Sequence, residues 1–363
     1  MSRSFPLFLL FALVLTACDS QDTTPENVPA ERAVVVNGGN FSDQNGHLSV
    51  WDPARETVQQ LGDQAGFLHG IEQDEDRLLV LVSTFSGGRV DLLDRESLEL
   101  TTQWTGMDAP RDVAILDDDA WLVTSAFGSP GKVLRMNRNT GMIQAETEVG
   151  FAPESIAAFA DRIVVANNGS LGSGKTLTSI DPATGTASEK EVDCDGPREL
   201  LPDGEQLVLV CSGKTVYSDD FSEVLSRTSG RVLFLNTSLT ETHRVELAGQ
   251  PGSTNGTDAS FFEPVSKRLF LTMPSEGEIV VLNTGARSRE QTISVSEDNA
   301  WTGLSGIAYD PSTDLLYVGR FPVSAAGPFP DYASAGQVWI LDGTGNRSGS
   351  FAIGASPSAI LLQ

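Results

Sequence analysis

The stretch from Glu154 to Glu189, ESIAAFADRIVVANNGSLGSGKTLTSIDPATGTASE, shows the unit from which the chain is built. Short strands are predicted over residues 154–159, 162–168, 176–181 and 186–192, because apolar and β-branched residues alternate there with polar ones. A turn at Asp161, a glycine-rich loop and the DPATG turn separate these strands. Four antiparallel strands within about 40 residues are the size and order of one β-propeller blade.

The same unit recurs along the whole chain. An Asp or Asn that starts a tight turn follows an apolar strand at seven places, which are Asp52, Asp94, Asn137, Asp181, Asn236, Asn283 and Asp342. The markers lie 42 to 59 residues apart, and the wider intervals contain inserted loops. Such side chains accept hydrogen bonds from the backbone just downstream, so each marks the turn between the third and fourth strands of a blade.

Innermost strands are also predicted seven times, over residues 68–71, 111–116, 154–159, 198–201, 256–261, 303–308 and 357–362. The chain begins with a strand of the second type, Ala33–Asn37, whereas the last innermost strand lies at the C-terminus. This last strand must therefore complete the first blade, which closes the ring and removes free sheet edges. We predict an all-β, seven-bladed propeller of four-stranded antiparallel blades, forming a single domain over residues 32–363.

The composition limits the classes of partner. The 363 residues include 49 acidic and 24 basic ones, for a formal charge of −25. Such a surface repels phosphate backbones and anionic lipids, so we expect no nucleic-acid partner and no membrane contact except through an anchor.

The N-terminus has the pattern of a lipoprotein signal. Arg3 precedes an apolar run that is too short for a transmembrane helix and ends in Leu-Thr-Ala-Cys18. This resembles the bacterial lipobox, which predicts a signal peptide over 1–17, lipidation of Cys18 and a disordered, lipidated tether over 18–31. We expect a lipid-anchored cell-envelope protein, at the outer membrane or cell surface rather than the inner membrane. The membrane leaflet stays open.

Two further cysteines, Cys194 and Cys211, flank a hairpin predicted for residues 198–201 and 206–210. Mirror positions around its turn bring them near each other. A disulfide is therefore expected in an oxidising envelope, and the alternative is a pair of buried thiols.

Loop lengths predict where ligands bind. Connections between the second and third strands are long, over residues 38–45, 83–88, 125–131, 168–174, 212–230 and 321–336, and strand alternation places them on one face. Candidate ligand-binding residues on this face are Phe41, Phe85, Phe127, Asn168, Tyr217, Trp301, Arg320, Phe321, Phe329 and Tyr332. Candidates at the rim of a central channel are His69, Arg111, Glu154, Arg198 and Asp258.

Motifs for catalysis are weak. Residues 169–176 fit GxxxxGK[ST], but a strand follows where a phosphate-binding loop needs a helix. The three histidines lie in different blades without metal-ligand spacing, and no GxSxG motif is present. Glu154 and Asp258 are the carboxylates that could hold Ca²⁺ near the channel, as in propeller lactonases. We expect no cofactor and no bound metal.

Residues 37–53, NGGNFSDQNGHLSVWDP, resemble the first-blade signature of the YncE-like propeller lipoproteins of Bacteroidota, with Gly38 where that family often has Glu. Residues 109–115 (APRDVAI), 152–158 (APESIAA) and 166–169 (ANNG) match later blades. The resemblance implies the propeller fold over the mature chain. Some members capture cobalamin at the cell surface and pass it to a TonB-dependent outer-membrane transporter. Their corrinoid contacts lie on variable loops and cannot be transferred to individual residues of this chain.

Three functions are consistent with these patterns. The first is a lipid-anchored protein that captures a corrinoid or similar ligand on the loop-rich face and docks on a transporter. The second is an envelope scaffold for protein or glycan partners. The third is a lactonase-type or hydrolase enzyme, which the absence of a nucleophile–base pair in the sequence disfavours.

Overall fold

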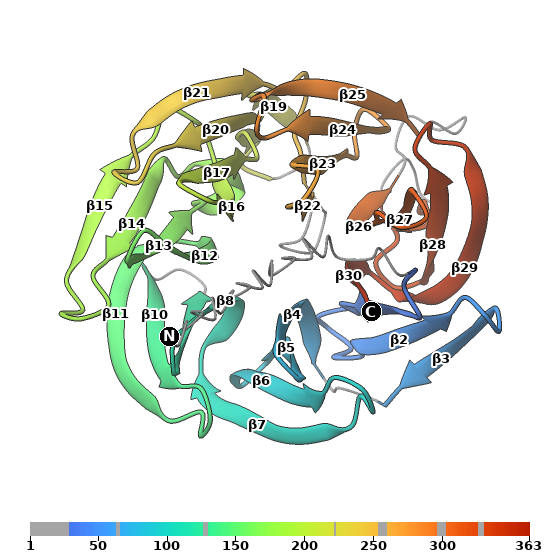
Figure 1. Cartoon of the computed structure of the whole chain (residues 1–363), viewed down its shortest axis with the longest axis horizontal. Helices are drawn as coiled ribbons and strands as arrows, with labels where there is room; N and C mark the ends of the chain where they lie inside the picture. Colours follow the sequence, from blue (N-terminus) through green and yellow to red (C-terminus); the bar gives the residue numbers. More distant parts are fainter. Residues whose placement is uncertain are drawn as a thin grey trace, which may run out of the picture.

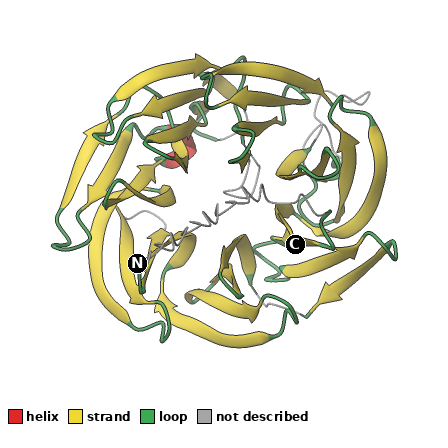
Figure 2. Cartoon of the chain, viewed as in Figure 1, coloured by secondary structure: helices red, strands yellow, loops and turns green. Residues whose placement is uncertain are grey.

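A computed structural model describes residues 29–62, 66–125, 130–220, 223–252, 260–295, 303–325 and 330–363. Seven four-stranded antiparallel sheets are arranged as blades around a common axis (Figure 1). Strands dominate these residues, with one short 3₁₀ helix, η1 (Ser170–Gly172), among them (Figure 2). None of the described helices is long and apolar enough to cross a membrane. The predicted all-β, seven-bladed propeller is confirmed.

Each of the first four blades has four strands, ordered from the axis outward. Blade 1 contains β30 (Pro357–Leu362), β1 (Ala33–Asn37), β2 (His47–Asp52) and β3 (Thr57–Leu61). Blade 2 contains β4 (Phe67–Asp74), β5 (Arg77–Thr84), β6 (Gly87–Asp94) and β7 (Leu100–Met107). Blade 3 contains β8 (Ala109–Leu116), β9 (Asp119–Ser125), β10 (Pro130–Asn137) and β11 (Ile143–Phe151). Blade 4 contains β12 (Pro153–Phe159), β13 (Arg162–Asn167), β14 (Thr176–Ile180) and β15 (Ala187–Glu191).

The remaining blades follow the same order. Blade 5 contains β16 (Pro197–Asp203), β17 (Gln206–Cys211), β20 (Arg231–Leu235) and β21 (Glu241–Glu246). An extra hairpin, β18 (Thr215–Tyr217) and β19 (Val224–Arg227), is inserted in this blade. Blade 6 contains β22 (Ser260–Glu263), β23 (Arg268–Met273), β24 (Glu278–Asn283) and β25 (Ser288–Ser294). Blade 7 contains β26 (Leu304–Asp310), β27 (Leu315–Arg320), β28 (Ala335–Asp342) and β29 (Arg347–Ala355).

The C-terminal strand closes the ring as predicted. β30 pairs antiparallel with β1, with Val35 opposite Ile360, and Figure 1 shows the C-terminus beside the first strands. Trp51 of blade 1 stacks on Phe351 of blade 7, with ring centroids 4.5 Å apart. Sheet pairing and aromatic packing therefore join the first and last blades.

The core lies between blades rather than within them. Seven clusters of buried apolar side chains each contain residues from two neighbouring blades. The second strands are almost wholly buried, because a neighbouring blade covers each of their faces. The fourth strands, such as β3 and β15, are mostly exposed and carry polar residues. This decrease in burial from the second to the fourth strands explains why the second strands contain the largest share of β-branched residues.

The Asp and Asn markers start turns at all seven predicted places. The Asp181 carboxylate, for example, accepts hydrogen bonds from the backbone N–H groups of Ala183 and Thr184, at 2.8 and 3.0 Å. Equivalent bonds occur at Asp52, Asp94, Asn137, Asn236, Asn283 and Asp342. These turns define one face of the disc, which we call the plain face.

The opposite face, which we call the loop-rich face, carries the connections between second and third strands and those between blades. The prediction of a long loop over residues 83–88 is wrong. The ladder of β5 and β6 continues to the pair Thr84 and Gly87, so that only Phe85 and Ser86 form the turn. The hairpin forms because Gly87 adopts a φ of 137°, which other residues rarely reach. Phe85 is thus held at the tip of a hairpin.

A disulfide joins Cys194 and Cys211, whose Cα atoms are 6.2 Å apart. The hairpin between them extends slightly further than predicted, because Pro197 pairs with Cys211 and Asp203 with Gln206. Both cysteines lie in the apolar cluster between blades 4 and 5. The bond therefore fixes the connection between these blades next to their shared core.

Removing this bond should destabilise the propeller measurably. Closing a loop of this length is worth about 3 kcal/mol in chain entropy, so the Cys194→Ala/Cys211→Ala variant should lose about 2–4 kcal/mol of unfolding free energy. Denaturant unfolding of the oxidised protein and the variant would measure the difference. Adding a reductant to the wild-type protein should reproduce the loss and leave the variant unchanged; equal stability in all samples would contradict a structural role.

Candidate functional site

Aromatic rings from two blades meet on the loop-rich face. Phe41, in the β1–β2 loop, lies edge-on to Phe85, with ring centroids 5.3 Å apart. It also contacts Phe67 at the start of β4, at 6.2 Å. Phe85 is 69% exposed and Phe41 is 49% exposed, although a buried position is the usual one for large apolar rings. This exposed cluster, which we call the Phe41–Phe85 patch, is supported from below by Phe67.

The patch continues inward to a charged cluster near the loop-rich ends of the inner strands. The Phe67 ring contacts the His69 ring at a centroid distance of 4.9 Å. Arg111 of β8 donates hydrogen bonds to Glu154 of β12, one of them 3.1 Å long from Nε, and approaches His69 Nδ1 at 2.6 Å. Three blades thus contribute to one cluster, which brings together three of the predicted rim residues.

The hydrogen bonds fix the protonation state of His69. Arg111 has only donors, so His69 Nδ1 accepts, and Nε2 carries the proton toward Ser83 Oγ, 2.7 Å away. Burial, followed by the charge of Arg111, holds the pKa of His69 well below its usual range. A neutral imidazole therefore bridges the guanidinium and the serine at neutral pH.

Side chains also link the inner strands of neighbouring blades, which form no backbone ladder with one another among the described residues. Asp112 accepts a hydrogen bond from the Ile156 backbone N–H at 2.9 Å, and Ser155 Oγ accepts one from the Leu200 N–H at 3.3 Å. Ser260 donates to Glu199 in the same way. Burial raises the pKa of Asp112 to about 6, although hydrogen bonds to its carboxylate lower it.

These inner strands surround a cavity of about 370 Å³. Its lining combines the carboxylates of Glu72, Asp112 and Glu199 with the apolar residues of β8, β12 and β16. Among the described residues, no group of three or more His, Cys, Asp or Glu could hold a metal ion. Glu154, one of the two carboxylates considered for Ca²⁺, is paired with Arg111.

Two tyrosines from different blades lie on the loop-rich face. Tyr217 belongs to the extra hairpin of blade 5, and Tyr332 to the β27–β28 loop of blade 7. Partial burial, and then the nearby Tyr217, raise the pKa of Tyr332. Tyr332 is 37% exposed, which leaves part of its ring accessible.

Three predicted ligand contacts make contacts within the protein. Phe321 is only 1% exposed and supports the Tyr332 ring at 5.5 Å, so its prediction as a ligand contact is wrong. Asn168 is buried and donates to Ser212 Oγ at 3.2 Å, which joins two loops. Arg320 stacks on Trp339, with its Cζ 3.7 Å from the ring centroid. In each case the side chain contributes to contacts between loops or strands.

The remaining predicted site residues either do not belong to the two clusters described above or lie outside the described part of the chain. Arg198 is half-buried, and its guanidinium lies close to Gly252. Phe127, Trp301, Phe329, Asp258 and Cys18 lie outside the described residues.

The GxxxxGK[ST] match is a structural loop. β14 follows it directly, so no helix N-terminus is available for phosphate. Gly172 has a φ of +79°, and a Cβ there would lie 1.9 Å from the Gly213 carbonyl oxygen. Close contact between the loops of blades 4 and 5 therefore requires the glycine.

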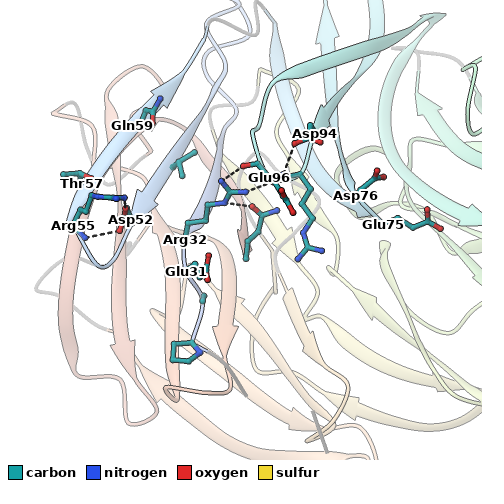
Figure 3. A pocket seen from close by; sticks show the side chains of 15 residues that line it. Glu31, Arg32, Asp52, Arg55, Thr57, Gln59, Glu75, Asp76, Asp94 and Glu96 are labelled. Carbon is teal, nitrogen blue, oxygen red and sulfur yellow. Dashed lines mark hydrogen bonds and ion pairs between the residues drawn. The ribbon is translucent and has the colours of Figure 1, made fainter. Parts of the chain in front are cut away.

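A large cleft lies on the opposite, plain face, for which the sequence predicts no binding role. This cleft of about 1360 Å³ lies between blades 1 and 2 and is lined mostly by charged side chains (Figure 3). Asp52 pairs with Arg55 and, like Asp94, accepts turn hydrogen bonds that lower its pKa. Two of its carboxylates thus serve local turns, and none of the described residues that line it is aromatic.

The buried His69 should make the propeller sensitive to acid. Its pKa is depressed on folding, so below about pH 6.5 the unfolded state binds the proton more tightly and stability falls as the pH falls. Asp112, with its raised pKa, has the opposite sign below about pH 6.

Between pH 7.5 and 5.5, His69→Gln should therefore remove about 1 kcal/mol of the pH-dependent loss in unfolding free energy. Asp112→Asn is the matched control and should increase the loss. Identical pH profiles for wild type and His69→Gln, measured by denaturant unfolding, would contradict the neutral state of His69.

No protein-family model matches the sequence, and no curated protein matches it. Solved structures are similar to it: a hypothetical selenium-binding protein from Sulfolobus tokodaii is 11% identical, with a TM-score of 0.67 over 93% of this chain and 94% of that one. Apo AztD from Citrobacter koseri is 11% identical, with a TM-score of 0.53 over 92% and 98%.

The dihydro-heme d1 dehydrogenase NirN, in complex with DHE, is 13% identical, with a TM-score of 0.54 over 93% of this chain and 76% of that one. At these identities the likeness shows the fold alone, and it includes an enzyme. The fold implied by the resemblance to YncE-like lipoproteins is thus supported, and membership of that family stays a prediction.

Proposed function

We propose that this protein is a lipid-anchored binding protein of the cell envelope, which captures a bulky, partly apolar ligand on its loop-rich face. The observation that carries the proposal is the exposed Phe41–Phe85 patch beside the charged cluster of Arg111, Glu154 and His69. Binding sites commonly combine apolar and aromatic walls with a few fixed polar groups.

The energetics favour a ligand that covers both rings. Completing the burial of the two exposed phenyl groups would contribute about 2–4 kcal/mol. The rings are held by a hairpin tip and by Phe67, so little ordering entropy opposes binding. A rigid, exposed aromatic pair is therefore better explained by a contact surface than by the stability of the blade.

The ligand class follows from the groups around the patch. The rings suit a large, flat apolar surface, while the Tyr332 hydroxyl and the Arg111–Glu154 pair suit polar substituents at its edge. A corrinoid such as cobalamin has this combination, and it is the ligand of some proteins that the sequence resembles. We therefore propose a corrinoid-like nutrient, with a TonB-dependent outer-membrane transporter as the partner that receives it.

The envelope location is supported by two independent features. The lipobox predicts acylation of Cys18, and the Cys194–Cys211 disulfide fits an oxidising compartment. The outer membrane or cell surface is the proposed site.

A scaffold for protein partners is a second candidate, favoured by the extra hairpin of blade 5. Val224 and Leu225 are exposed on β19, and β18 and β19 pair only with each other among the described strands. Exposed apolar residues on a short two-stranded sheet are a common docking surface.

Titration calorimetry with cyanocobalamin tests the first proposal. Phe85→Ala and Phe41→Ala should each weaken binding by about tenfold or more, because about 1.4 kcal/mol of apolar contact is removed. Met142→Ala is the matched control, since Met142 is 66% exposed on the plain face. No heat from wild-type protein at micromolar concentration would remove the corrinoid, and equal weakening by Met142→Ala would remove the assigned face.

The scaffold candidate has its own test. Val224→Asp/Leu225→Asp should abolish co-purification of a membrane partner from detergent extracts while leaving cyanocobalamin binding unchanged. Asp substitutions at these exposed positions cost little stability, so thermal unfolding should match the wild type. Retention of every partner by the variant would remove the hairpin as a docking surface.

A further inference from the structure

The first described residues of the chain enter the ring at the plain face. Pro29–Arg32 line the large cleft between blades 1 and 2 (Figure 3). The backbone N–H groups of Glu31 and Arg32 donate to the Gln363 carbonyl oxygen at 2.6 and 3.1 Å, and the Gln363 N–H donates to the Arg32 carbonyl oxygen at 3.0 Å. The pairing of β1 with β30 thus continues beyond both strands toward this face.

The Arg32 side chain fixes this position. Its Nε donates to Gln363 Oε1 at 2.8 Å, its Nη1 to the Glu96 carbonyl oxygen at 2.9 Å, and its Nη2 to the Arg95 carbonyl oxygen. All three guanidinium nitrogens are therefore bonded to the C-terminus or to a turn of blade 2. Charged donors in such bonds contribute more than neutral ones, so the chain leaves the ring from one defined place.

We propose that the membrane tether leaves from the plain face and so holds the loop-rich face, with the Phe41–Phe85 patch, directed away from the bilayer. This inference rests on the proposed lipid anchor at Cys18. The plain face then lies toward the lipid, and the patch is presented to a ligand or transporter on the far side.

The short length of the tether favours this orientation. Eleven residue steps separate Cys18 from Pro29, which span at most about 38 Å when fully extended and about 18 Å as a flexible coil. Turning the loop-rich face to the membrane requires the tether to pass β2 and β3 and then the height of the blade, about 35 Å in all. Only an almost fully extended tether reaches that far, which costs conformational entropy.

Fluorescence quenching on vesicles tests the orientation. A chain beginning at residue 18 with Cys18→Ser has an N-terminal serine, which periodate converts to an aldehyde for coupling to an aminooxy lipid. A dye is attached through Ser86→Cys on the loop-rich face or Asn139→Cys on the plain face, both exposed positions. With a nitroxide on the lipid headgroup, the dye at 139 should be quenched at least about twofold more than the dye at 86, given the short tether.

A longer tether is the matched control. Inserting a Gly/Ser spacer of about 30 residues after Asn27 raises the coil dimension to roughly 35 Å, so the difference between the two dyes should shrink. Equal quenching with the native tether, or stronger quenching at 86, would overturn the proposal. Because the lipid is coupled chemically, the result does not depend on acylation in cells. Mass spectrometry of the protein from bacterial membranes tests acylation, and an unmodified Cys18 there would remove only the anchor.

Discussion

The structure depends on one constraint, which is that no blade can bury both of its own faces. Along β1 the side chains alternate between two neighbours, with Val34 and Val36 in the cluster shared with blade 2 and Ala33 and Val35 in the cluster shared with blade 7. Each blade therefore needs a neighbour on either side, and only a closed ring supplies both to all seven. β30 provides the closure by pairing the C-terminus with β1.

Closure explains how polar groups are distributed. The second strands are occupied by inter-blade packing, so their buried stretches are apolar, whereas the fourth strands, the turns and the inner strands carry charged residues. Arg111 is half-buried on such an inner strand, where Glu154 and His69 supply partners from two other blades. A pair of this kind contributes little net stability, because desolvation opposes its attraction. Its effect is to fix how three blades meet beneath the Phe41–Phe85 patch.

Much of the fold could be predicted because its signals are local. Each Asp or Asn marker acts on its own turn, and alternation along each strand is set by its immediate neighbours. Contacts between blades could not be predicted in the same way. Phe321 has the sequence context of an exposed loop aromatic, yet it supports Tyr332, and Phe67 gives no signal although it supports Phe41. These roles depend on side chains far apart in sequence, which a periodicity cannot locate.

The candidate site also shows where loop length fails as a guide. The sequence predicts a long loop around Phe85, but the ring stands at the tip of a two-residue turn, and this makes it a better contact residue. An aromatic ring on a long loop can fold back onto the protein, as Phe321 does, and so become buried. On a short turn the backbone is too short for the ring to reach a buried position, so the ring stays exposed unless another molecule covers it. Within the proposed binding surface, the more exposed ring is therefore Phe85 on the rigid two-residue turn, and the less exposed one is Phe41 on the longer β1–β2 loop.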